Sequence, residues 1–291
     1  MNKVTKILIL TGIGLICIGM LIAAFNFQTL FKPFYNESEF DKKEYYVEAD
    51  LSKLVVDTDN EAVRIIPYEG KSLKITYFED KDNEYIITEN SDIVTLKKKE
   101  VINFFYFSFN FNFKMPDILI EVPADLKLAY DIKSDNSKIE LANITISDSV
   151  FKTSNGSMSF ASVEADNLNC KTSNGRIKLN NTAAAKVNLK TSNGGIHLVN
   201  VNADSVIATT SNGKIELSNL ASPLIDLKNS NGRIYGTIVG DETDYQKQLS
   251  TSNGKITIDG YEYEKNVNEL HPASNMLKAK TSNGSINIDF K

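Results

Sequence analysis

The chain has 291 residues, enough for one large domain or two modest ones, and its formal net charge is −5. This charge argues against a strongly basic nucleic-acid binder, and we expect no nucleic-acid partner. The two cysteines, Cys17 and Cys170, lie far apart in sequence, and Cys17 falls inside an apolar run, so we expect no disulfide framework.

An apolar segment near the N-terminus is the first predicted element. Residues 7–25 carry no charge, and a helix of this length, at about 1.5 Å rise per residue, just crosses a hydrocarbon core of roughly 30 Å. A cleaved signal peptide is the alternative, but the run is long for one and lacks a good cleavage site. Lys3 and Lys6 favour an inside N-terminus. We therefore expect a single-pass cell-membrane protein with a cytoplasmic N-terminus (1–6), a transmembrane anchor (7–25) and an extracytoplasmic C-terminal domain.

Short strands are predicted after a linker. Residues 26–44 contain Pro33 and mixed polarity, which is typical of a linker. Residues 45–130 contain short runs rich in β-branched residues, separated by polar turns such as Asp57 to Asn60, and predict a strand region continuous with the C-terminal repeats. Phenylalanines at alternate positions of 105–113 give one aromatic face. We interpret it as a cover for the stack; the alternative is an edge that binds a membrane or a partner.

The segment 131–291 is organised by a repeated phrase, Thr-Ser-Asn-Gly, with two degenerate copies. Its asparagines are Asn136, Asn155, Asn174, Asn193, Asn212, Asn231, Asn253 and Asn283. They are separated by 19 residues five times, then by 22 and by 30. A fixed period of this size predicts a repeat architecture in which each unit packs on its neighbours.

Each repeat is predicted to be one coil of a β-solenoid. When the asparagine is numbered zero, positions +3, +5, −4 and usually −6 are apolar and alternate with polar positions. This predicts one strand before and one after the asparagine, with a third short strand near +8 and +10. Parallel stacking at about 4.8 Å would bury the apolar faces. We predict an all-β, single-stranded parallel β-helix, right-handed by default, with coils of about 19 residues after one N-terminal transmembrane helix.

The four-residue phrase has a structural explanation. The chain turns a corner there, and Asn and Gly tolerate a positive φ. We expect the eight asparagines to form a hydrogen-bonded turn ladder. The threonine at −2 shares the parity of positions −4 and −6, so we expect it to point inward. Cys170 occupies an inward −4 position and is interpreted as a small core residue.

Basic residues recur at position −3 and, in several coils, at +2. We expect stacking to align them into one stripe along the Asn-Gly edge. The stripe comprises Lys133, Lys152, Lys171, Lys190, Lys228, Arg176, Lys214 and Arg233. One hypothesis is that it binds an anionic polymer, such as a cell-wall polyanion, or lipid headgroups. The alternative is that lysines keep strand surfaces soluble and non-aggregating.

No catalytic signature is visible. There is no metal-ligand spacing, phosphate-binding loop or nucleophile motif, and His197 is predicted to point outward without a nucleophile partner. We therefore predict no catalytic, metal-binding or cofactor-binding residue and no cofactor. Because some β-helix proteins cleave polysaccharides, a polysaccharide-binding or polysaccharide-cleaving protein is the alternative.

The phrase Ile120-Glu121-Val122-Pro123, followed by repeated Ser/Thr-Ser-Asn-Gly-x-Ile-x-Leu coils, resembles the bacterial DUF4097 family, which includes the membrane-anchored LiaG-like proteins of Gram-positive bacteria. The resemblance spans roughly residues 45–291. It implies a surface-exposed β-helix with an adhesin label and no catalytic residues. We expect a non-enzymatic, adhesin-like surface scaffold, linked to envelope stress, whose partner is a wall polyanion or another envelope protein. A polymerising solenoid is a further alternative.

Overall fold

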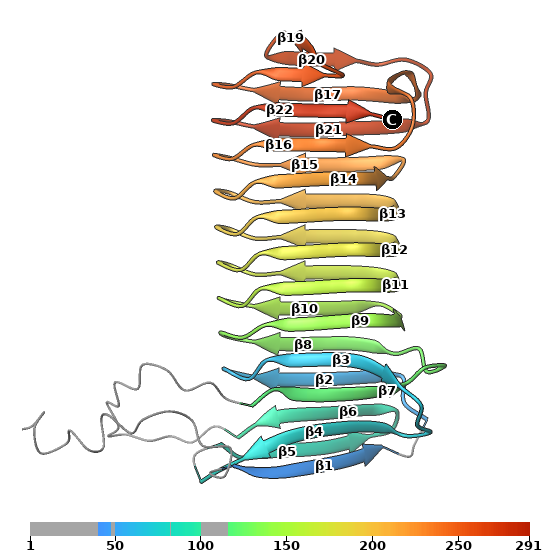
Figure 1. The fold of residues 1–291 in the computed structure, drawn as a ribbon, viewed down its shortest axis with the longest axis vertical. Coiled ribbons are helices and arrows are strands. Elements are labelled where there is room, and N and C mark those ends of the chain that lie inside the picture. The colour runs from blue at the N-terminus through green and yellow to red at the C-terminus, as the bar shows by residue number, and fades with distance from the viewer. Residues whose placement is uncertain (1–39, 48–49, 82, 100–115) are drawn as a thin grey trace, which may run out of the picture. The chain divides into compact units, whose positions relative to one another are not determined.

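Stacked β-strands dominate the computed structural model, which describes residues 40–47, 50–81, 83–99 and 116–291 (Figure 1). A short 3₁₀ turn, η2 (Glu242–Asp244), is the only helical element in these ranges. None of the described residues forms a helix long and apolar enough to cross a membrane. The predicted anchor at 7–25 and the aromatic segment at 105–113 lie outside the described residues.

Three consecutive coils show the repeat at its most regular. Each is a single strand of 14 residues: β11 (Met158–Lys171), β12 (Ile177–Lys190) and β13 (Ile196–Thr209). They pair in parallel with a shift of one repeat, so that Phe160, Leu179 and Leu198 are direct neighbours. The parallel stacking predicted from the period is therefore confirmed.

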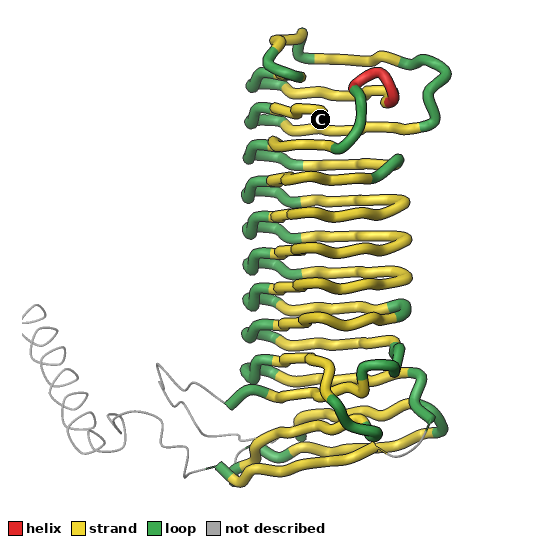
Figure 2. Tube along the Cα trace, turned by 45° about the vertical axis from the view of Figure 1, so that its right-hand side comes forward, coloured by secondary structure: helices red, strands yellow, loops and turns green. Residues whose placement is uncertain are grey.

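The stack continues on both sides of these coils. The preceding strands are β7 (Ile118–Pro123), β8 (Ala129–Ser134), β9 (Ile139–Ile146) and β10 (Ser149–Thr153). The following strands are β14 (Ile215–Ala221), β15 (Leu224–Lys228), β16 (Ile234–Ile238), β17 (Tyr245–Thr251), β18 (Ile256–Ile258), β21 (Asn275–Thr281) and β22 (Ile286–Phe290). The four-residue corners lie in one file along one edge, as the green turns at the left of Figure 2 show.

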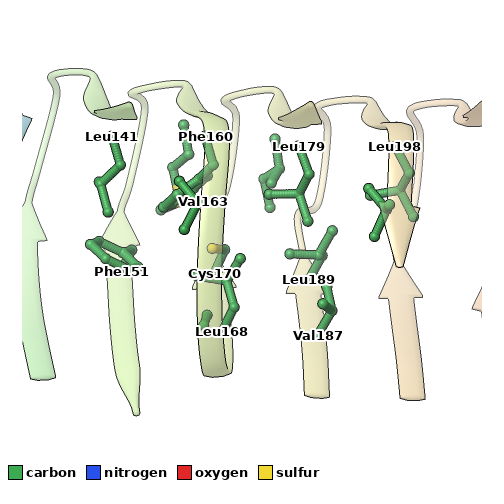
Figure 3. Packing of buried hydrophobic residues seen from close by; sticks show 14 of the residues in the cluster. Leu141, Phe151, Phe160, Val163, Leu168, Cys170, Leu179, Val187, Leu189 and Leu198 are labelled. Carbon is green, nitrogen blue, oxygen red and sulfur yellow. The ribbon is translucent and has the colours of Figure 1, made fainter. Parts of the chain in front are cut away.

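The core consists of side chains stacked in columns between the strand layers. Leu141, Phe160, Leu179 and Leu198 follow the corner, and Phe151, Cys170 and Leu189 precede it (Figure 3). All of them are buried. Each such side chain contributes about 1.5–3 kcal/mol of transfer free energy, which makes the column the main stabilising element of each coil.

A second corner divides each coil after position +5. Residues at +7 have a positive φ there: Asn143, Ser162, Asn181, Asn200 and Asn219, at 50–60°. Odd positions such as +5 point inward before the bend, and even positions such as +8 and +10 point inward after it. Val163 and Ala165 are therefore buried, in register with Ile144 and Ile146. The third apolar pair is thus real, but it belongs to the same continuous strand and is not a separate one.

The Asn-Gly corner needs glycine for a different reason from the one we expected. Neither its asparagines nor its glycines have a positive φ. Instead, a Cβ atom on Gly175 would lie 1.7 Å from the carbonyl oxygen of Gly156 in the neighbouring coil. The equivalent distance at the other corner glycines is 1.6–1.9 Å. Glycine is therefore required because the backbones approach closely, not because of left-handed geometry.

The first coil in the sequence is the second coil of the stack. Its strands, β2 (Lys53–Thr58) and β3 (Val63–Tyr68), lie between β8–β9 on one side and β6 (Ile93–Lys98) with β7 on the other. Figure 1 shows the blue strands β2 and β3 between the green strands β8 and β7. The corner of this coil is Thr58-Asp59-Asn60-Glu61. Sequence analysis treated Asp57 to Asn60 as an ordinary turn and so missed this copy of the phrase.

The last coil in the sequence is likewise inserted. β21 pairs with β15 on one side and β17 on the other, and β22 lies in the same way between β16 and β18. The expected stacking of each coil on its sequence neighbour is therefore wrong after Asn231. The coil of Asn253 lies two positions beyond the coil of Asn231, and the coil of Asn283 occupies the position between them. The longer spacings of 22 and 30 residues supply the extra connections.

Antiparallel strands close both ends of the stack. At one end β1 (Asp41–Val47) pairs with β4 (Leu73–Glu79), β4 pairs with β7, and β5 (Tyr85–Asn90) pairs with β6. At the other end β19 (Tyr261–Tyr263) pairs with β18, and β20 (Asn266–Glu269) pairs with β17. β1 begins inside the segment that we assigned to the linker. Short or charged edge strands of this kind resist further strand pairing.

Candidate functional site

The asparagine ladder runs along the corner edge. Each Nδ2 donates to the Oδ1 of the neighbouring asparagine at 2.6–2.7 Å, and the bonded pairs are 136–60, 155–136, 174–155, 193–174, 212–193, 231–212, 283–231 and 253–283. All eight predicted asparagines lie in this file, together with Asn60. At the C-terminal end of the ladder the spatial order is Asn231, Asn283, Asn253, because the coil of Asn283 lies between the other two.

The hydrogen bonds of the corner threonine explain why the repeated phrase begins with this residue. Thr172 Oγ1 accepts the N–H of Gly175 and donates to the carbonyl oxygen of Gly156, both at 3.1 Å. Asn229 replaces threonine in one coil and makes the same two contacts through its amide. The hydroxyl is buried, so a lost partner would cost about 1–3 kcal/mol. The threonine and asparagine side chains of the motif thus bind neighbouring coils to one another.

A second ladder was missed by the sequence analysis. Asn200 donates to Asn181 and Asn219 donates to Asn200, both at 2.8 Å, at the positive-φ corner. The signal was present in the sequence as asparagine at +7 in four coils. Asparagine tolerates the left-handed region better than most residues, so this is the position where the conformational argument applies.

The predicted basic stripe consists of two separate columns. The lysine column at −3 lies on the strand before the corner, where Lys133, Lys152, Lys171, Lys190, Thr209, Lys228 and Lys280 are in direct register. The +2 residues Arg176, Lys214 and Arg233 lie after the corner, on the way to the other strand layer. Ser157 and Gly195 interrupt that second column. Only the −3 column is nearly continuous.

The members of the lysine column differ in their partners. Lys133 pairs with Asp57 at 3.0 Å, and Lys228 pairs with Asp226 at 2.7 Å. Lys152, Lys171 and Lys190 are exposed and make no ion pair with any residue that the structure describes. We call these three residues the lysine triplet. Its strands are in the middle of the sheet, so protection of a sheet edge does not explain the three lysines.

A polar cluster around His197 lies on the strand layer that follows the Asn-Gly corner. Its Nδ1 lies 3.0 Å from a Glu216 carboxylate oxygen, and Lys214 lies 2.7 Å from the same carboxylate and 2.8 Å from the Tyr235 hydroxyl. Burial lowers the pKa of His197; Glu216 opposes this, while nearby cations reinforce it. No serine, threonine or cysteine contacts the imidazole among the hydrogen bonds of the described residues. We assign no chemistry to this cluster.

Two lysines point inward near the ends of the stack. Lys98 pairs with Glu61 at 2.8 Å, and both side chains are buried or nearly so. Lys247 contacts Glu242 at 2.6 Å and Glu269 at 2.7 Å. Burial alone would lower the pKa of Lys247, but the two glutamates hold this pKa above its ordinary value. Inward charges at terminal coils disfavour the docking of another stack.

Cys170 is a core residue, as predicted. It is fully buried, and burial raises the pKa of its thiol well above the usual value. No three His, Cys, Asp or Glu side chains in the described parts of the chain are grouped to hold a metal ion.

The match of one family model decides the family of this chain. The model of the Toastrack DUF4097 family matches residues 51–289. The chain belongs to the DUF4097 Toastrack family. Curated proteins yield no match to this Toastrack chain.

A comparison with solved structures also gave matches. One is described as a putative adhesin from Parabacteroides distasonis, at 12% identity, a TM-score of 0.48, and coverage of 87% of this chain and 97% of that one. Another, a putative adhesin from Bacteroides fragilis, has 15% identity, a TM-score of 0.46 and coverage of 86% and 96%. A protein from Parabacteroides distasonis described as lipid binding has 13% identity, a TM-score of 0.41 and coverage of 86% and 96%.

Proposed function

We propose that this Toastrack protein is a non-enzymatic, membrane-anchored scaffold that displays its β-solenoid outside the cytoplasm as an adhesin-like module. One observation carries the scaffold role. The polar groups that recur in every coil are used to bind neighbouring coils, through the asparagine ladder and the corner threonines. A motif used in this way builds a rigid surface, and its repeated side chains do not converge on one reacting centre.

The anchored placement rests on the sequence. Residues 7–25 form an uncharged apolar run of membrane-spanning length, and lysines precede it. The resemblance to LiaG-like proteins supports a role in the response to envelope stress. The proposed partners are the membrane, through the anchor, and a component of the cell envelope.

A self-polymerising solenoid is less well supported. Both ends of the stack are closed by antiparallel strands, and inward lysines lie beside them. Pairing with a second stack would require these strands to be displaced and buried charges to be exposed. We therefore infer a rod of fixed length.

Protease accessibility on intact cells tests the placement. A protease added outside should cleave the chain after residue 25, while a cytoplasmic control protein stays intact. Full protection until the cells are lysed would refute the extracytoplasmic placement. For the enzymatic alternative, the full chain is incubated with polysaccharides, and reducing ends are measured. Turnover that disappears when one face of the solenoid is substituted would refute the scaffold role.

A further inference from the structure

We propose that the lysine triplet, Lys152, Lys171 and Lys190, binds a linear polyanion that lies along the axis of the stack. This inference deepens the proposed function, since it names the class of partner that the scaffold would hold. Only the cellular location of the partner depends on the proposed extracytoplasmic placement. Binding itself can be measured with purified protein.

The first argument is the register. Lys152 pairs with Lys171 and Lys171 pairs with Lys190 in consecutive parallel strands. Their Cα atoms are therefore spaced by about 4.8 Å, less than the Debye length of about 8 Å at physiological ionic strength. Three like charges at this spacing repel one another in the free protein. A chain of regularly spaced anions laid over them removes that repulsion.

The second argument is the absence of carboxylates around the triplet. In these three coils the outward positions −1 and −5 hold Ser154, Ser173 and Ser192 on one side and Val150, Asn169 and Asn188 on the other. The same positions in the coil of Asn136 hold Asp131 and Asp135, and −5 in the coil of Asn231 holds Asp226. On one side the patch ends where Asp131 and Asp135 begin, and on the other side Thr209 ends it one coil before Asp226. The lysines of the two aspartate-containing coils, Lys133 and Lys228, are paired.

The third argument separates this surface from simple solubilisation. Solubility is served equally well by paired charges, which the chain uses at Lys133 and Lys228. Within the −3 column, the triplet is a run of three consecutive coils whose cations have no ion-pair partner among the described residues, and exposed hydroxyls and amides lie beside them. Such neutral donors and acceptors can bind the hydroxyl and carbonyl groups of a polymer between its charges.

The geometry favours a narrow polymer over a bilayer surface. Asp148, Glu164, Asp166 and Asp204 are exposed on the same coils, towards the other corners. The chain as a whole carries a net charge of −5. A broad anionic plane would approach these carboxylates together with the lysines, whereas a single strand can follow the triplet alone.

The test uses the full chain in a non-ionic detergent. The probes are polygalacturonate and inorganic polyphosphate, which distinguish a carboxylate polymer from a phosphate polymer, and the monomers galacturonate and orthophosphate at equal anion concentration. We expect at least one polymer to bind at least tenfold more tightly than its monomer, because three contacts act together. Lys152→Gln, Lys171→Gln and Lys190→Gln combined should weaken polymer binding at least tenfold and reduce the slope of log K against log salt by about two.

A matched variant controls for net charge. Lys71, Lys81 and Lys291 are exposed, make no ion pair among the described residues, and lie away from the triplet. Changing all three to Gln removes the same charge and should alter the affinity less than twofold. Equal losses in the two triple variants, or no loss in the first, would overturn the proposal.

Lysine labelling distinguishes a membrane partner. The full chain is placed in vesicles of phosphatidylcholine, with or without phosphatidylglycerol, and acetylation of each lysine is measured by mass spectrometry. Polymer should protect the triplet at least fivefold relative to Lys71 and Lys81. Protection by phosphatidylglycerol but not by either polymer would replace the polymer with a lipid surface and overturn the proposal. None of these outcomes bears on the protease test, so the two proposals fail separately.

Discussion

Asn283 donates a hydrogen bond to Asn231 at 2.7 Å across 52 residues of sequence, while the asparagine that follows Asn231 in the repeat, Asn253, lies one coil further away. The final coil therefore completes the interior of the stack. Its two strands are the only described strands that link β15–β16 to β17–β18. Several properties of the molecule depend on contacts of this kind.

Removal of residues 271–291 should disorder more than the removed coil. Without β21 and β22, the strands β17 and β18 lose their parallel partners. We expect hydrogen exchange to show loss of protection in β17, β18 and the antiparallel strands β19 and β20, while β11–β13 remain protected. Deletion of residues 176–194, one central repeat, is the matched control and should leave both ends protected. Retained protection of β17 in the truncated chain would contradict this account.

Two neighbouring glycines should respond differently to the same substitution. A Cβ atom on Gly194 would lie 1.7 Å from the carbonyl oxygen of Gly175, so Gly194→Ala should lower the free energy of unfolding by about 3 kcal/mol. The nearest atom to a Cβ on Gly195 is 3.1 Å away on the His197 side chain, and other coils carry side chains there. Gly195→Ala should cost under about 1 kcal/mol. Thermal unfolding followed by circular dichroism measures both, and similar costs would refute the close-approach explanation.

The corner hydroxyl can be tested at Thr191. Its Oγ1 accepts the N–H of Gly194 and donates to the carbonyl oxygen of Gly175, both at 3.1 Å. Thr191→Val keeps the shape but leaves both backbone groups unpaired, and should cost about 1–3 kcal/mol. Thr191→Ser keeps the hydroxyl and should cost about 0.8 kcal/mol for the lost methyl group. Chemical denaturation ranks the two variants; a serine variant less stable than the valine variant would show that packing, not hydrogen bonding, selects threonine.

Glu61 should make the stack sensitive to acid. Burial alone would raise the pKa of its carboxyl, but hydrogen bonds from Lys98 and Thr58 outweigh burial and lower it. Since the folded pKa is below the unfolded value of about 4.3, the ionised group stabilises the protein above that pH, and the contribution is lost as pH falls through the folded pKa. Glu61→Gln should cost about 3 kcal/mol at neutral pH and flatten the acid limb of the stability curve.

The double variant Glu61→Gln with Lys98→Met controls for a buried unpaired charge. It should recover part of the lost stability, because the uncompensated ammonium is gone. Unfolding temperatures measured from neutral pH down to about pH 2.5 provide the comparison, a range that spans the ordinary glutamate pKa. An acid limb equally steep in wild type and Glu61→Gln would show that other carboxylates control the pH dependence.

Periodicity predicted the coils and their buried columns, because a spacing of 19 residues fixes which side chains share a column. It did not predict the order of the end coils. The spacings before Asn253 and Asn283 reveal extra connecting chain, but not which open position that chain reaches. The coil of Asn60 escaped notice because Glu61 stands where glycine is expected. The corner of this coil accommodates the side chain of Glu61, whose carboxylate accepts a hydrogen bond from Lys98.

Site prediction was limited in a similar way. The basic columns at −3 and +2 were visible in the sequence, but their separation by the corner depends on the path of the chain between strand layers. The ion pair of Lys133 depends on Asp57 of another coil, whereas Lys228 pairs with Asp226 of its own strand. Among the described residues, the lysine triplet has neither kind of partner. Periodicity shows which residues are equivalent, whereas the charges around them depend on the coils above and below.

Because both ends are interlocked while β11, β12 and β13 are geometrically equivalent, the reach of this protein can change without redesign of its termini. Insertion or loss of one 19-residue unit in that middle section would lengthen or shorten the rod by about 4.8 Å. Evolution, or a protein engineer, could thus adjust how far the molecule extends in uniform steps.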